Sequence, residues 1–120
     1  LACIRPDGRP HVIPVWQEWD GKDFYIIAWH GSQWADYVQA NPNVSLTIDE
    51  PWAPLRRVVV SGCAQAYEAS PSDLDRLLSR MTRRYLGRPA AAGLSQQVQR
   101  AFRVHPEALR GWQGLLKVEN

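Results

Sequence analysis

The sequence has little cysteine, little net charge and no long apolar run. Its two cysteines, Cys3 and Cys63, lie in strand-like stretches without metal-ligand spacing, which favours reduced, partly buried thiols over a disulfide framework. Fourteen Lys and Arg against twelve Asp and Glu give a formal charge of +2, too small a surplus to predict nucleic-acid binding. No apolar run is long enough to span a bilayer, and no signal-peptide pattern is visible. We therefore expect a cytoplasmic protein with neither a membrane nor a nucleic-acid partner.

Familiar catalytic motifs are missing as well. The three histidines, His11, His30 and His105, are too scattered to indicate a metal site, and no Gly-rich phosphate loop or nucleophile set is present.

What the chain does have is tryptophan. Six Trp in 120 residues indicate aromatic-lined pockets or a subunit interface in addition to a core. The length predicts a single domain over residues 1–120, and because the chain opens directly in a strand we expect the natural N-terminus to lie before Leu1.

The first third of the chain predicts an antiparallel meander. A strand over residues 1–4 is followed by the turn signal Pro6-Asp7-Gly8 and by a returning strand over residues 11–19. Pro14 removes one hydrogen-bond donor from that strand, which favours an edge or a bulge. A second tight turn then leads into a strand over residues 24–29.

Residues 29–49 predict a strand end, a short helix and a further strand. The pair Gly31-Ser32 opens the helix, Asn41-Pro42 closes it, and residues 44–49 alternate as a half-buried strand does. A helix that begins directly after a strand offers free N–H groups to an anion such as a phosphate.

The second half predicts a long strand, a long helix and final strand material. Gly62 inside the strand over residues 56–68 indicates a bulge or a close backbone approach. Ser70 caps a helix over residues 71–86, which Gly87 ends. After it we expect a looser helix over residues 88–99 and strands over 102–105 and 109–112, split by Pro106. Short strands with inserted helices predict a mainly β protein, a small barrel decorated with helices.

Several of these segments, in this order, resemble the pyridoxamine 5′-phosphate oxidase-like, flavin-binding split-barrel superfamily, in particular its small flavin- or deazaflavin-dependent oxidoreductases. The similarity is carried by residues 1–16, 31–32, 41–46, 57–64 and 110–112. It implies a six-stranded antiparallel split β-barrel with Greek-key character. It further implies a homodimer that holds FMN or deazaflavin (coenzyme F-420) at the subunit interface and passes a hydride to a small planar substrate. The cofactor would carry the chemistry, so no catalytic side chain and no metal ligand is expected.

The resemblance also implies a set of cofactor-binding residues. In the family the cofactor phosphate lies at a strand-to-helix junction where Ser or Thr is followed by Arg and Lys; Ser32 matches, while Gln33 and Trp34 replace the two cations. The residues expected at the site are Pro14, Trp16, Ala28, Trp29, His30, Ser32, Gln33, Trp34, Arg56, Arg57 and Trp112.

For several of these residues a structural role is an equal alternative. Trp29 and Trp34 either stack on a planar ligand or seal the core or a dimer interface, and His30 is either a ligand contact or a surface residue. Arg56 and Arg57 either reach a partner's ligand or end a solvated strand. Trp52 either covers the pocket or is an oligomer contact.

Two alternatives concern the whole protein. One is a non-redox binding protein on the same fold that holds another aromatic ligand such as haem, and the other is an interaction domain without a pocket between subunits. The arginines of residues 72–86 repeat at helical spacing and are typical of the solvated face of an amphipathic helix.

Overall fold

The computed structural model describes residues 1–114 and 116–118. Its elements in chain order are β1 (Ala2–Ile4), β2 (Pro10–Val12), β3 (Gln17–Trp19), β4 (Phe24–Trp29), α1 (Trp34–Ala40), β5 (Asn43–Asp49), β6 (Arg56–Ala66), α2 (Pro71–Leu86), the 3-10 helix η1 (Leu94–Gln97), β7 (Val98–Gln113) and β8 (Leu116–Val118).

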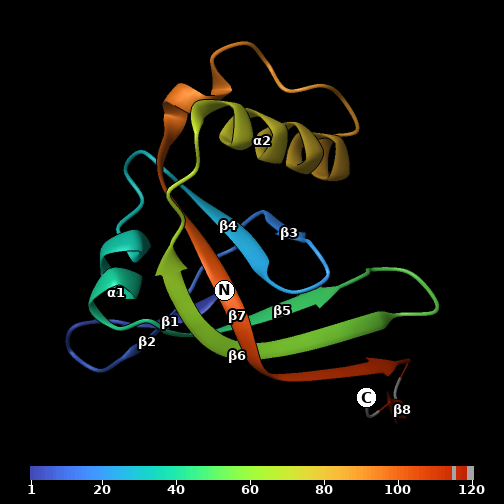
Figure 1. Ribbon diagram of the computed structural model, residues 1–120. Helices are drawn as coiled ribbons and strands as arrows, with labels where there is room; N and C mark the ends of the chain where they lie inside the picture. Colours follow the sequence, from blue (N-terminus) through green and yellow to red (C-terminus); the bar gives the residue numbers. More distant parts are fainter. Residues whose placement is uncertain (115, 119–120) are drawn as a thin grey trace.

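The strands form one antiparallel sheet, which confirms the mainly β prediction. The hydrogen-bonded order is β2-β1-β5-β6-β7-β4-β3, and β8 pairs with β7. The predicted count of six strands is wrong, because the described part of the chain contains eight. Within that part, β2 and β3 end the order without pairing to each other, so the sheet curls without closing into a barrel (Figure 1).

A break at Pro14 separates two strands that we expected to be one. β2 ends at Val12 and β3 begins at Gln17, so residues 13–16 form a connector between the two strands, and only Ile13 still exchanges backbone hydrogen bonds with Leu1. Pro14 has no N–H to give to a ladder, and the N–H of Ile13 bonds the carbonyl oxygen of Leu1 at 2.9 Å. The predicted three-strand meander is therefore wrong: the connector carries the chain from one end of the strand order to the other.

The predicted bulge at Gly62 is confirmed. Gly62 pairs with Pro106 whereas Ser61 pairs with Ala108, which leaves Glu107 as the extra residue on β7. Since a bulge tolerates a residue without an N–H, β7 runs on through Pro106. The predicted split of the final strand at this proline is wrong.

α2 begins and ends as predicted and covers the outer face of β4. The Ser70 hydroxyl accepts a hydrogen bond from the Asp73 N–H at 3.2 Å, and Gly87 ends the helix in the left-handed conformation. Neighbouring residues of β4 face opposite ways: Ile26 packs inside the curled sheet and Ile27 packs under α2. The looser helix expected over residues 88–99 is wrong; only the short η1 forms there.

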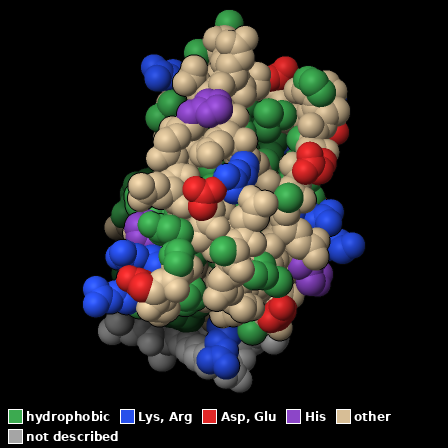
Figure 2. Space-filling model, turned by 90° about the vertical axis from the view of Figure 1, so that its left-hand side faces the viewer, with side chains coloured by type: hydrophobic (Ala, Val, Ile, Leu, Met, Phe, Trp, Pro, Cys, Tyr) green, Lys and Arg blue, Asp and Glu red, His purple; other side chains and the backbone are tan. Residues whose placement is uncertain are grey.

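The arginines of α2 lie on its exposed side, as expected of an amphipathic helix. Arg80 and Arg84 pair with Glu18 of β3, at 3.9 and 3.2 Å, and Arg76 pairs with Asp73, so three of these cations are already near a carboxylate. On the face that Figure 2 shows, Lys and Arg side chains are interspersed with Asp and Glu and with hydrophobic groups rather than gathered in one basic patch. No helix in the described part of the chain has both the length and the apolar character that a bilayer crossing needs.

Asp20 orders the turn between β3 and β4, and its contribution is expected to depend on pH. Its carboxylate accepts from the N–H of Asp23 at 2.7 Å, the N–H of Lys22 at 2.8 Å and the hydroxyl of Tyr25 at 2.8 Å. The hydrogen bond from the Asp23 backbone is the main cause that lowers the pKa of Asp20. A lowered folded-state pKa stabilises the fold above the unfolded-state pKa of about 4, and this stabilisation is lost as the pH falls through the folded-state pKa.

Asp20→Ala should therefore lower the denaturant midpoint more at pH 7 than at pH 2. Unfolding curves of the wild type and the variant at both pH values measure this. The exposed Asp49→Ala is the matched control. An equal loss at the two pH values would contradict an electrostatic contribution from Asp20.

Candidate functional site

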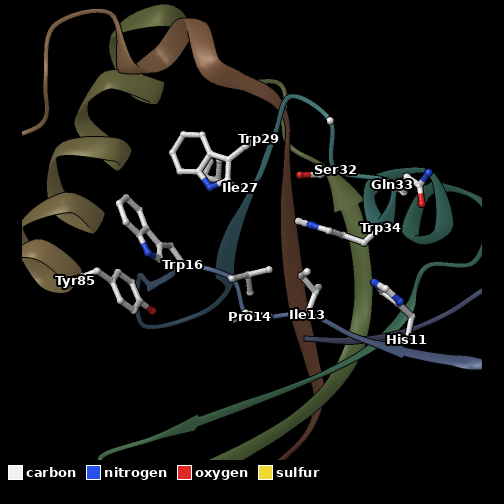
Figure 3. Close-up of a pocket in the computed structure, with 12 residues that line it drawn as sticks. His11, Ile13, Pro14, Trp16, Ile27, Trp29, Ser32, Gln33, Trp34 and Tyr85 are labelled. Atoms are coloured by element: carbon white, nitrogen blue, oxygen red, sulfur yellow. The ribbon is translucent and has the colours of Figure 1, made fainter.

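A cleft of about 750 Å³ lies where the two ends of the sheet face each other. Three stretches line it: the end of β2 with the connector, the end of β4 with the loop into α1, and the end of α2 (Figure 3). The connector contributes because Pro14 keeps it out of the ladder. The lining residues are His11, Ile13, Pro14, Val15, Trp16, Ile27, Trp29, Gly31, Ser32, Gln33, Trp34 and Tyr85.

Three aromatic rings form one wall of the cleft. Trp16 stacks nearly parallel on Tyr85, with ring centroids 5.4 Å apart and an interplanar angle of 3°. Trp29 meets Trp16 edge to face at 5.6 Å. The Tyr85 hydroxyl accepts a hydrogen bond from the N–H of Gln17 at 3.1 Å, which fixes the end of α2 to the start of β3. The wall is thus rigid and apolar, suited to contact with a flat ring.

The loop before α1 contributes Ser32 and Gln33 to the cleft. Figure 3 shows the Ser32 hydroxyl pointing toward the cavity and the Gln33 amide pointing away from it. Ser32 was expected to open the helix, which is wrong: α1 begins at Trp34, and Gln33 holds the capping position without a side-chain hydrogen bond. The reason is a tight turn in which the Ser32 N–H bonds the Trp29 carbonyl oxygen at 3.0 Å.

Trp34 belongs to the core as well as to the cleft. It is 4% exposed, and its ring lies 5.8 Å from that of Phe102 inside the curled sheet. Figure 3 shows its nitrogen at the end of the ring that points to the cavity. The structure therefore shows the packing role of Trp34 in the core, whereas its stacking on a planar ligand stays a prediction.

Six of the eleven expected site residues line the cleft, and the other five do not. Those in the cleft are Pro14, Trp16, Trp29, Ser32, Gln33 and Trp34. Ala28 faces the buried interior, and the exposed His30 gives its N–H to Gln97 of η1 at 2.9 Å. Arg56, Arg57 and Trp112 lie together at the far end of the β6–β7 ladder, where Arg57 pairs with Trp112 and Arg56 bonds Glu50 at 2.6 Å.

The sequence interpretation missed Tyr85 and His11. Tyr85 follows Leu77, Leu78 and Met81 at helical spacing, and a tyrosine at the last position of such an apolar face is the signal that could have placed it at a cavity rim. His11 is half-buried and stands edge to face against Tyr37 at 5.5 Å. Ile13, Val15, Ile27 and Gly31 complete the lining and carry no sequence signal of their own.

The described lining contains no Lys, Arg, Asp or Glu. His11 is the one side chain there that can carry a positive charge. Such a cleft suits a planar, largely apolar ring. To an anionic group its described residues offer hydroxyl, imidazole, amide and indole donors but no Lys or Arg.

Comparison with known families identifies the family of the chain. The family model described as pyridoxamine 5′-phosphate oxidase matches residues 1–113, and the chain belongs to that family. This confirms the resemblance inferred from the sequence.

Three relatives illustrate the range of the family. A pyridoxine/pyridoxamine 5′-phosphate oxidase of Rubrobacter xylanophilus is 29% identical over 95% of this chain and 64% of its own length, so the chain spans less than two thirds of that relative. A solved FAD-binding protein of Mesorhizobium loti is 28% identical with a TM-score of 0.66, over 92% of this chain and 80% of that one. A solved F-420 reductase is 26% identical with a TM-score of 0.71, over 90% and 84%.

Proposed function

We propose that this protein is a flavin- or deazaflavin-dependent oxidoreductase that passes a hydride to a small planar substrate. The observation that carries the proposal is the aromatic cleft at the junction of β4 and α1, with Ser32 directed into it. Membership of the family and the similarity to an F-420 reductase and to an FAD-binding protein support the assignment to cofactor-dependent redox chemistry.

The cleft fits the ring system of such a cofactor. Its volume of about 750 Å³ is within the usual range for small-molecule sites, and the Trp16–Tyr85 stack presents a flat apolar surface. The ring of Trp29, at the end of β4, meets Trp16 of that stack edge to face and lines the cleft on the β4 side. When bound, a flavin or deazaflavin supplies the hydride chemistry. This chain's residues stack against the ring, orient it and exclude water from its apolar face.

The cleft offers few partners for the phosphate of the cofactor. Ser32 offers one hydroxyl, and no Lys or Arg is present in the described lining. We propose that a second copy of the chain supplies the missing cations from Arg56 or Arg57, next to Trp112. These three residues lie outside the cleft of their own chain, at one end of the β6–β7 ladder. Their position supports a site shared between two subunits.

A non-redox ligand site is the second candidate, and one observation favours it. The lining lacks cations but includes His11, whose imidazole is a common ligand of haem iron. Haem or another aromatic ligand would use the same tryptophan and tyrosine wall.

A titration of the purified protein with FMN, deazaflavin and haem in parallel, followed by tryptophan fluorescence, distinguishes the candidates. We expect quenching by FMN or deazaflavin, since Trp16 and Trp29 line the cleft. Saturation by haem alone would favour the second candidate, and no binding of FMN or deazaflavin would exclude the first. Sedimentation of the same samples tests the homodimer.

Gln33→Arg should tighten binding of FMN about tenfold. Gln33 is exposed beside Ser32, and a charge-assisted hydrogen bond to phosphate contributes about 1.5–3 kcal/mol. The gain should fall as salt is added, because salt screens exposed charges. Gln65→Arg is the matched control, since Gln65 is exposed on β6 outside the cleft. Equal gains in the two variants would mean that the phosphate does not lie at Ser32.

A further inference from the structure

A second hollow, of about 360 Å³, lies on the outer face of the sheet, separate from the aromatic cleft. It is formed where β6, β7 and the turn before β4 meet. Titratable side chains dominate it: Lys22, Asp23, Cys63, Arg103, His105 and Glu107. None of them lines the aromatic cleft.

The centre of this hollow is a bonded histidine and aspartate. His105 Nδ1 lies 2.7 Å from Asp23 Oδ1, and the other oxygen of Asp23 lies 3.9 Å from Arg103 Nε. The Asp23 side chain is 7% exposed, whereas that of His105 is 62% exposed. A buried carboxylate that accepts from Nδ1 fixes the orientation of the imidazole and leaves Nε2 as the nitrogen that can take a proton.

Cys63 stands beside this histidine. Cys63 and His105 are directly opposed residues of the antiparallel β6–β7 ladder, and both line the hollow. Opposed residues have Cβ atoms about 4.5–5.5 Å apart and share one face of the sheet. Because Asp23 holds the imidazole, rotation of the Cys63 side chain is the movement that would bring its sulfur toward His105. The bulge at Gly62 sits immediately before this pair and sets its register.

We propose that Cys63 is a reactive thiol whose base is His105, held by Asp23, and that it exchanges with small-molecule disulfides. His105 Nε2 takes the proton of the thiol, and the thiolate sulfur attacks one sulfur of the disulfide. The disulfide bond of the reagent breaks and a mixed disulfide with Cys63 forms. The released thiolate takes the proton back from His105, so the reagent half is reduced while Cys63 is oxidised.

The second cysteine is an internal control. Cys3 is 1% exposed in the core, and burial raises the pKa of its thiol. A folded molecule should therefore be modified at Cys63 and spared at Cys3. Modification of both cysteines at similar rates would show that the reagent reacts with unfolded protein, and not with a reactive site at Cys63.

The test is the rate of mixed-disulfide formation with glutathione disulfide, followed by mass spectrometry and peptide mapping. At pH 7 we expect a single adduct at Cys63, about tenfold slower in His105→Gln because assistance by the base is lost. Cys63→Ser should form none. His30→Gln is the matched control, since His30 is an exposed histidine outside the hollow.

A second pH separates assistance by a base from a structural effect. Above about pH 10 a thiol ionises without a base, so the wild type and His105→Gln should react alike there. Asp23→Asn should resemble His105→Gln at both pH values. Equal rates of the wild type and His105→Gln at pH 7, or a Cys63 that glutathione disulfide does not modify, would overturn the proposal.

Discussion

Replacing Trp34 with alanine is expected to lower the free energy of unfolding by about 3–5 kcal/mol. Trp34 is 4% exposed and packs on Phe102 inside the curled sheet, where Ala35 and Val38 of the same helix are also buried. Removal of the indole leaves a cavity that the surrounding strands cannot fill without moving. For a domain of ordinary stability this is about a fifth or more of the total.

Denaturant unfolding measures this loss, and Trp52→Ala is the control. Trp52 is 70% exposed in the loop after β5, so its removal should change stability by less than about 0.5 kcal/mol. A loss below about 1 kcal/mol for Trp34→Ala would mean that Trp34 serves the cleft alone. The cation that the family carries at this position cannot be restored here without the same loss, which is why Gln33 is the better position to test.

Gly62→Ala is expected to cost about 3 kcal/mol, at the upper end of overpacking effects. A Cβ added at Gly62 would lie 2.2 Å from the backbone oxygen and 3.1 Å from the backbone carbon of His105. Both atoms belong to the paired strand, so relief requires β6 and β7 to separate at the bulge. A flexible side chain could turn away from the new methyl group, whereas this backbone cannot.

Ser61→Ala is the control for this effect. Ser61 is the exposed neighbour on the same strand, and it loses only a 3.3 Å contact with the Ser45 hydroxyl. We expect a change within about 0.5 kcal/mol. Thermal unfolding of the two variants measures the difference. Equal stability of Gly62→Ala and the wild type would show that the two strands can move apart at little cost.

The elements that local signals mark were predictable from the sequence. Ser70 followed by Pro71 identified the start of α2, Gly87 its end, and Gly62 the bulge, because each depends on the backbone chemistry of one or two residues. The junction of β4 and α1 was also located, although the helix begins later than Ser32.

Elements that depend on distant partners were not predictable. Pro14 gave a signal, but whether a proline marks a bulge or a complete break depends on what lies beside the strand. Pro106 shows the opposite outcome, since a bulge opposite Gly62 lets β7 continue. The contribution of Tyr85 to the cleft requires α2 to be folded back over β4, which no local pattern specifies.

The shortness of β2 and β3, the two edge strands of the sheet, affects how the protein can associate with other molecules. β2 and β3 are three residues long each, and the chain leaves the ladder at Pro14 between them. Short edges present few unpaired N–H and C=O groups, so they are poor templates for the addition of a strand from another molecule. This geometry protects the protein against edge-to-edge aggregation at β2 and β3.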